Sequence, residues 1–125
     1  MNILIVDDSR TMRSLIIREL NKTRIPLTSV LQADDAESAL KIVSQESLHM
    51  ILTDWHMKKM SGLEFIKQVK EAHPTIPIGM ITSERDESMK QQVISEGAGF
   101  ILNKPVKAAS LEVEILKLLK KTYKS

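Results

Sequence analysis

Five short apolar segments, each followed by a longer segment with helical periodicity, constrain the fold of this chain more than any other feature. The apolar segments have the length of β-strands and lie at residues 2–7, 29–33, 49–54, 78–83 and 99–103. Helices are expected at residues 10–22, 35–45, 61 to shortly before 74, 86–96 and 108–122. Apolar runs without alternation are typical of parallel strands that are covered on both faces. We therefore predict an α/β fold with a doubly wound, five-stranded parallel sheet and five helices in a three-layer sandwich.

Local signals support three of these helix boundaries. Asp35 is placed to cap the second helix through its side chain. Ser61 and Glu64 have the spacing of a capping box at the start of the third helix. Gly97 is expected to end the fourth helix, because glycine readily adopts the left-handed conformation found at helix ends.

Composition narrows the class of protein. At 125 residues the chain is expected to form a single domain, residues 1–125, around one core. Hydrophobic residues make up 42% and charged residues 27%, which is ordinary for a globular protein and argues against disorder. The net charge of +2 is too small to indicate a nucleic-acid partner. The basic residues near the C-terminus are interpreted as the solvated face of the last helix: Lys117, Lys120, Lys121 and Lys124.

The sequence also bears on the compartment. It contains no cysteine, which suits a reducing cytoplasm and excludes thiolate chemistry and zinc–cysteine sites. The apolar segment after Met1 is too short for a signal peptide, and none of the apolar segments is long enough to span a membrane. We therefore expect a cytoplasmic protein with no membrane partner.

Polar residues follow the apolar segments at the point where each strand should end. In a doubly wound sheet the carboxyl ends of the strands share one edge, where ligands bind. The residues expected at this edge are Asp7, Asp8, Asp54, Thr82, Ser83 and Lys104. Taken singly, an Asp pair is more often a favourable helix start, a Lys-Pro dipeptide a loop and a Thr a helix cap. Their predicted convergence on one edge is the feature that indicates a site.

Clustered carboxylates indicate a cation. Two unit charges about 4 Å apart repel by about 1 kcal/mol in water and about 4 kcal/mol at an effective dielectric constant of 20. Oxygen ligands without histidine or cysteine side chains favour Mg²⁺ or a similar hard ion. Because Mg²⁺ commonly partners phosphate oxygens, the cluster suggests phosphoryl chemistry, in which a carboxylate is able to act as nucleophile and form an acyl phosphate. Lys104 would supply the complementary positive charge.

Together these motifs resemble the receiver domain of two-component response regulators, and the resemblance covers the whole chain. The motifs that carry it are "ILIVDDS", "ILTDWHMKKMSG", "ITS" and "GAGFILNKP". The sequence is most similar in type to the stand-alone, CheY-like chemotaxis regulators. The resemblance implies the flavodoxin-like (CheY-like) version of the predicted sandwich.

The resemblance implies a phosphoacceptor and a metal site. Asp54 matches the carboxylate that attacks the phosphohistidine of a histidine kinase. Asp7 and Asp8 match the acidic pair that holds Mg²⁺, together with Asp54 and the backbone carbonyl of His56. The protein would then catalyse only its own phosphorylation and dephosphorylation and would not be an enzyme in the usual sense.

Further residues match the switching part of the family's pattern, with one departure. Thr82 matches the hydroxyl that moves toward the phosphoryl group, and Lys104 matches the lysine that pairs with a phosphoryl oxygen, followed by a cis bond to Pro105. The family's switch aromatic lies three residues before this lysine, where this chain has Ile101. Phe100 is adjacent but should point to the opposite face of the strand.

Two other positions depart from common family residues. His56 lies where an asparagine is common, and Glu84 lies two residues after Thr82. In the family these two positions tune the hydrolysis of the aspartyl phosphate. Lys58 takes the place of a frequent proline in the loop after Asp54.

The leading hypothesis is a phosphorylation-driven switch in chemotaxis. Its fourth helix, fifth strand and fifth helix are expected to form the face that binds a partner such as a flagellar motor switch component. A monomer is expected. Three alternatives stay open: a receiver separated from a larger regulator, for example a DNA-binding one, a phosphorylation-independent interaction module, and a small phosphatase. The lack of a linker after the last helix favours a stand-alone protein over the first, and the intact acid triad with Lys104 argues against the second. The third lacks the Asp-x-Asp arrangement and a cap domain.

Overall fold

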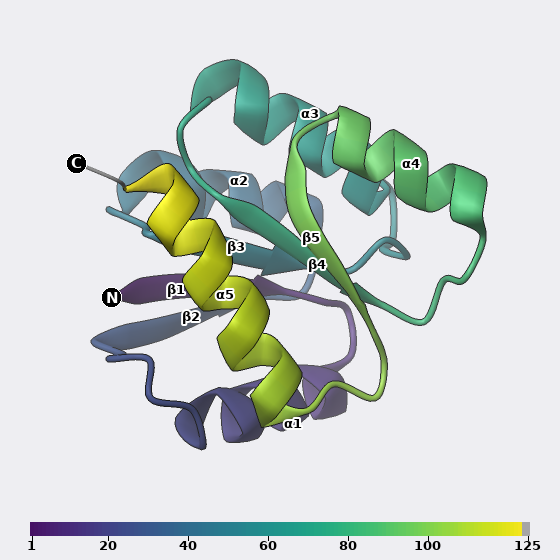
Figure 1. Ribbon diagram of the computed structural model, residues 1–125. Helices are drawn as coiled ribbons and strands as arrows, with labels where there is room; N and C mark the ends of the chain where they lie inside the picture. Colours follow the sequence, from purple (N-terminus) through teal and green to yellow (C-terminus); the bar gives the residue numbers. More distant parts are fainter. Residues whose placement is uncertain (124–125) are drawn as a thin grey trace.

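The computed structural model describes residues 1–123 and confirms the predicted alternation of strands and helices (Figure 1). Lys124, the last member of the predicted basic cluster, lies outside the described residues. The elements in chain order are β1 (Asn2–Val6), α1 (Arg10–Asn21), β2 (Ser29–Ala33), α2 (Ala36–Gln45), β3 (Met50–Thr53), α3 (Gly62–Ala72), β4 (Ile78–Thr82), α4 (Glu87–Ser95), β5 (Ala98–Asn103) and α5 (Ala108–Thr122).

The five strands form one parallel sheet in the order β2-β1-β3-β4-β5. This is the strand order of the flavodoxin-like doubly wound fold, in which the chain reverses direction across the sheet after β2. Helices α1 and α5 cover one face, and α2, α3 and α4 cover the other (Figure 1). The prediction of a three-layer sandwich is therefore confirmed.

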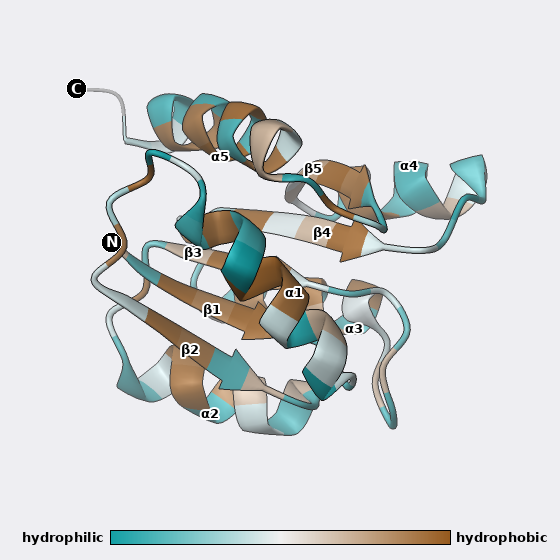
Figure 2. Cartoon of the chain, turned by 90° about the horizontal axis from the view of Figure 1, so that it is seen from below, coloured by the Kyte–Doolittle hydropathy of each residue, from teal (hydrophilic) through white to brown (hydrophobic). Residues whose placement is uncertain are grey.

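Strand alternation divides the buried side chains into two cores. Leu4 and Val6 of β1 pack against α2 and α3, whereas Ile3 and Ile5 pack against α1 and α5. All four side chains are at most 1% exposed, so β1 is apolar on both faces, as Figure 2 shows for the middle of the sheet. This double burial explains why the strand segments have no alternating polarity in the sequence.

The predicted caps at Asp35 and Ser61 and the stop at Gly97 are present, and of the capping box the structure shows the bond to the Ser61 side chain. Asp35 accepts a hydrogen bond from the Ser38 amide at 2.7 Å, and Ser61 accepts one from the Glu64 amide at 3.2 Å. Gly97 follows α4 with φ +122°, a conformation that side chains rarely adopt. None of the helices in residues 1–123 combines the length and the hydrophobicity that a membrane span needs.

Two boundaries differ from the prediction in a way that matters for the site. Strand β3 ends at Thr53, so Asp54 lies in the loop just beyond it. Helix α4 begins at Glu87 because Asp86 is its N-cap and accepts hydrogen bonds from the amides of Ser88 and Met89. The bond between Lys104 and Pro105 is cis, as the resemblance implies.

Candidate functional site

The register of the sheet places Asp7 beside Asp54. Val6 is paired with Thr53, so the next residues of β1 and β3 emerge next to each other at the carboxyl edge. The Asp54 amide donates to the Val6 carbonyl at 3.0 Å, which continues the pairing past the end of β3. Both aspartates are buried, Asp7 at 1% and Asp54 at 6% exposure. Two carboxylates thus lie together where water screens them poorly.

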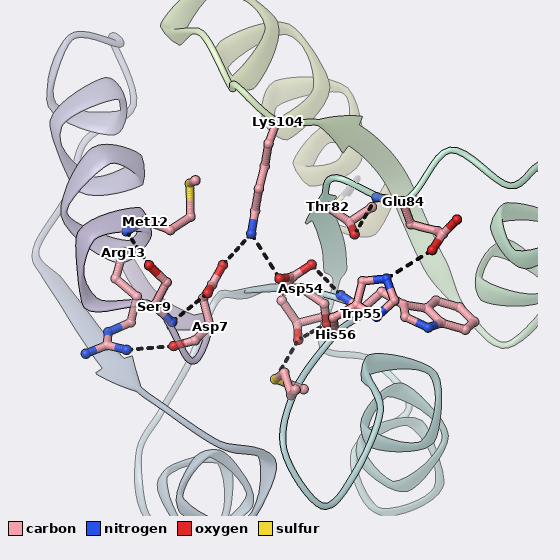
Figure 3. A network of polar contacts seen from close by, with 12 residues as sticks. Asp7, Ser9, Met12, Arg13, Asp54, Trp55, His56, Thr82, Glu84 and Lys104 are labelled. Carbon is pink, nitrogen blue, oxygen red and sulfur yellow. Dashed lines mark hydrogen bonds and ion pairs between the residues drawn. The ribbon is translucent and has the colours of Figure 1, made fainter.

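Lys104 balances these two charges. Its Nζ donates to Asp7 Oδ2 at 2.8 Å and to Asp54 Oδ2 at 2.9 Å, and Figure 3 shows the side chain reaching between the two carboxylates. Burial by itself would lower the pKa of Lys104, but the hydrogen bonds to Asp7 and Asp54 outweigh it, so this pKa lies above its ordinary value. The three predicted residues form one buried ion cluster.

The remaining oxygens of the two carboxylates face backbone amides. Asp54 Oδ1 accepts from the Trp55 amide at 2.7 Å, and Asp7 Oδ1 accepts from the Ser9 amide at 2.9 Å. These bonds fix the rotation of both carboxylates. Because a carboxylate has about four acceptor positions, each group retains capacity for a further partner.

The carboxylate pair fits a hard cation, although the complete acidic triad is not assembled. In residues 1–123 no three Asp, Glu, His or Cys side chains are arranged to hold a metal ion together. Asp8 is exposed, whereas Asp7 and Asp54 already share one cation, the Lys104 ammonium. An all-oxygen donor set next to an exposed third carboxylate is the chemistry that Mg²⁺ prefers.

The side chain of Arg13, in α1, contacts the backbone of Asp7. Its Nη1 donates to the Asp7 carbonyl at 2.6 Å and its Nε donates to Gln32 Oε1 at 2.9 Å, which ties the end of β1 to β2. The sequence prediction did not include this residue. One arginine in an amphipathic helix has no local signal that separates such a contact from a solvated charge.

Thr82 is buried at the end of β4, and its hydroxyl holds the following loop. Thr82 Oγ1 accepts from the Glu84 amide at 3.1 Å, and the side chain is 1% exposed. Ser83, the neighbouring hydroxyl considered from the sequence, is exposed. Figure 3 places Thr82 on the Asp54 side of the cluster.

Two side chains bridge the loops that follow β3 and β4. His56 Nε2 lies 3.0 Å from Glu84 Oε2, so the His56 ring contacts the opposite loop (Figure 3). The amide of Asp86 and the His56 ring hold the pKa of Glu84 below its ordinary value. The backbone carbonyl of His56 stays a predicted metal ligand.

The two candidates for the switch position lie on opposite faces of β5, as predicted. Phe100 is buried in the core beneath α1 and α5, and Ile101 contacts the core on the α2–α4 face. The switch position on the α4 side of β5 is therefore occupied by Ile101, whose aliphatic side chain has no hydrogen-bonding group.

Comparison with known proteins agrees with the resemblance to receiver domains. A family model described as the response regulator receiver domain matches residues 3–116. The chain is 34% identical over 113 residues to the two-component response regulator ORR3 of Oryza sativa, which covers 88% of this chain and 84% of that protein. It is 33% identical over 108 residues to a chemotaxis protein CheY homolog of Campylobacter jejuni, which covers 84% of this chain and 82% of that protein.

Solved structures of similar sequences share the fold over nearly the full length. A response regulator receiver domain protein from Clostridium thermocellum superimposes with a TM-score of 0.86 at 27% identity, covering 96% of this chain and 94% of that chain. The chemotaxis response regulator CheY4 of Vibrio cholerae superimposes with a TM-score of 0.81 at 28% identity, covering 94% of this chain and 97% of that chain.

Proposed function

Because this chain belongs to the response regulator receiver domain family, we propose that it is a phosphorylation-controlled switch in which Asp54 accepts a phosphoryl group from a histidine kinase. The observation that carries the proposal is the Asp7–Lys104–Asp54 cluster, with both of its ion pairs shorter than 3.0 Å. It holds a nucleophilic carboxylate, a second carboxylate and a cation at the edge of the sheet where ligands bind in this fold.

The proposed transfer begins at the Asp54 carboxylate. One of its oxygens attacks phosphorus, the P–O bond forms, and the bond from phosphorus to the histidine nitrogen of the kinase breaks, with the electron pair leaving on that nitrogen. The Trp55 amide orients the carboxylate through its hydrogen bond to Oδ1. Lys104 then pairs with the phosphoryl group, since its ammonium is already 2.9 Å from Asp54.

Mg²⁺ is part of this proposal. When bound, it would neutralise charge on the phosphoryl oxygens. Asp7, Asp8, Asp54 and the backbone carbonyl of His56 are the proposed ligands. The support for Asp7 is that its carboxylate lies buried at this edge, where the Ser9 amide and Lys104 each contact one of its oxygens.

Thr82 and the α4–β5–α5 face form the proposed output. The Thr82 hydroxyl would turn toward the phosphoryl group, and the loop that it holds would follow. The α4 and α5 helices carry large apolar side chains that are about half exposed: Ile94 at 45%, Val113 at 50% and Leu116 at 47%. A face of this kind is suited to binding a partner protein in response to the switch.

The similarity to a chemotaxis protein CheY homolog supports chemotaxis as the pathway, with a component of the flagellar motor switch as the output partner. A single receiver domain over residues 1–125, a monomeric state and a cytoplasmic location belong to the same proposal. The similar identity to the plant two-component response regulator favours, as second candidate, a receiver of a different two-component pathway.

Phosphorylation of the purified protein tests the assignment of Asp54. Incubation with Mg²⁺ and acetyl phosphate should add the mass of one phosphoryl group, and Asp54→Asn should abolish this addition. Asp34→Asn, which changes an exposed aspartate just past β2, is the matched control and should be labelled like the wild type. If the wild type gains no mass, or if Asp54→Asn gains as much, the proposed role of Asp54 is wrong.

A further inference from the structure

Asn103, the last residue of β5, joins the loop after β4 to helix α4. Its Nδ2 donates to the Glu84 carbonyl at 2.8 Å and to the Thr82 carbonyl at 3.3 Å. Its Oδ1 accepts from the Lys90 ammonium of α4 at 3.1 Å. One side-chain amide therefore contacts the switch threonine, the loop that follows it and the helix of the proposed output face.

These contacts fix the orientation of the amide. The two carbonyls require a donor and the ammonium requires an acceptor, so the reversed amide would face like groups on both sides. Asparagine is also depleted in strands, where it contributes little packing. Its presence at the end of an otherwise apolar strand is accounted for by these polar contacts.

Asn103 lies between the ion cluster and the helix. Its next neighbour along the chain is Lys104, whose amide donates to the Thr82 carbonyl at 2.9 Å and whose Nζ reaches Asp54. Since residues two apart in a strand share a face, Asn103 lies on the same face as Ile101, beneath α4. The Ile101 side chain has no hydrogen-bonding group, whereas the Asn103 side chain donates to the Thr82 carbonyl at the end of β4 and to the Glu84 carbonyl in the loop.

We propose that Asn103 transmits phosphorylation of Asp54 to α4 by releasing Lys90. This inference rests on the proposed function, because it requires Thr82 to turn toward a phosphoryl group. That turn removes the Thr82 acceptor from the Glu84 amide, so the loop shifts and the Glu84 carbonyl leaves Asn103. The freed amide no longer holds the Lys90 ammonium in place, and the charge presented by α4 changes.

According to this proposal, the Asn103 contacts stabilise the inactive conformation relative to the active one. They exist in the unphosphorylated structure, so removing them should favour binding of a phosphoryl mimic. Asn103→Leu should tighten the binding of beryllofluoride with Mg²⁺ by about fivefold, the change that the loss of one ordinary hydrogen bond produces. General damage to the fold would instead weaken this binding, so the sign of the change separates the two explanations.

Two measurements are needed, one for the binding of beryllofluoride and one for the response of α4. Fluorescence of Trp55, the only tryptophan, gives the affinity for beryllofluoride, because its amide is bonded to Asp54. Backbone amide chemical shifts of α4 show whether the signal reaches Lys90. In the wild type, beryllofluoride with Mg²⁺ should shift both the loop after Thr82 and α4. In Asn103→Leu the loop should still respond, while the α4 response should fall by at least half, because Lys90 is already free.

Two further variants separate the contacts of Asn103 with the two carbonyls from its contact with Lys90, and a third is a control. Asn103→Asp keeps an acceptor for Lys90 but faces the two carbonyls with an acceptor, so it should tighten beryllofluoride binding while α4 stays unresponsive. Lys90→Met should remove the α4 response and leave the hydrogen bonds to the loop in place. Lys67→Met, which changes an exposed lysine of α3, should behave as the wild type.

The proposal is overturned if Asn103→Leu binds beryllofluoride no more tightly than the wild type, or if its α4 amides respond in full. A wild type that gives no response to beryllofluoride with Mg²⁺ would overturn the proposed function, and the inference about Asn103 with it. A normal wild-type response combined with full transmission in Asn103→Leu would overturn only the role of Asn103.

Discussion

At the scale of single residues, the site depends on one lysine between two buried carboxylates. Asp7 and Asp54 lie next to each other because their strands are in register, and Lys104 is the cation that both of them contact. The side chains of the three residues are 14% exposed or less, so solvent contributes little to screening their charges. The lysine is therefore expected to stabilise the fold as well as to take part in phosphoryl transfer.

Replacing this lysine should destabilise the protein unless another cation is supplied. In EDTA, Lys104→Met should lower the free energy of unfolding by about 3 kcal/mol, the cost of leaving a buried charge without its partner. Millimolar Mg²⁺ should restore part of this loss, because a divalent ion would again separate the carboxylates. Urea denaturation with and without Mg²⁺ measures both effects. Lys67→Met is the control, and its free energy of unfolding should stay within about 0.5 kcal/mol of the wild-type value. If Lys104→Met is as stable as the wild type in EDTA, the proposed role of Lys104 in stability is wrong.

At the scale of elements, helix α5 begins with a cap that α1 supplies. In the described part of the chain, Lys107 at the N-cap position makes no side-chain capping bond, and the amide of Ala108 donates instead to Glu19 Oε1 at 3.0 Å. Glu19 is 7% exposed, and its other oxygen accepts from Lys22 at 2.9 Å. Glu19 thus couples α1, which follows the acidic pair, to a helix of the proposed output face.

This capping contact should make stability depend on pH. The hydrogen bonds from Lys22 and from the Ala108 amide hold the pKa of Glu19 below its ordinary value. A carboxyl with a lowered folded-state pKa stabilises the fold above its unfolded-state pKa, and this contribution is lost as the pH falls through the folded-state value.

Glu19→Gln should therefore lower the urea midpoint at pH 7, and the difference from the wild type should shrink as the pH falls below about 4. Other acidic groups with lowered pKa values are present in both proteins and cancel in the difference. Glu71→Gln, at an exposed position of α3, should show neither effect. A Glu19→Gln difference that is constant from pH 7 to pH 3 would show that the carboxylate charge does not contribute.

At the scale of the whole molecule, the unassembled acidic triad predicts that Mg²⁺ stabilises the native state. A ligand that binds only the folded protein raises its stability by mass action, by about 2.7 kcal/mol at a concentration 100 times its Kd. The melting temperature should therefore rise with Mg²⁺ concentration and fall again when EDTA is added.

Asp8→Asn should lose most of this gain, because Asp8 is the proposed third carboxylate ligand, while Asp34→Asn should retain it. Differential scanning fluorimetry over a Mg²⁺ series measures the shift. A wild-type melting temperature that is indifferent to Mg²⁺ would remove the metal site from the proposed function.

Much of the fold and part of the site follow from local sequence features. The order of strands and helices, the caps at Asp35 and Ser61 and the stop at Gly97 all depend on residues that are near one another in the chain. The edge position of Asp7 and Asp54 also follows locally, because each comes directly after an apolar strand.

What the sequence by itself could not determine depends on contacts between distant segments. It did not indicate that Asp7 turns inward while Asp8 remains exposed, because that choice depends on the strands beside β1. Arg13, Glu19 and Asn103 were missed for the same reason: each has a polar partner on another element, namely Asp7 and Gln32, Ala108, and Thr82, Glu84 and Lys90. Periodicity and capping act over a few residues, whereas the pairing of Lys104 with Asp7 spans 97 positions and exists only after the sheet has brought both ends together.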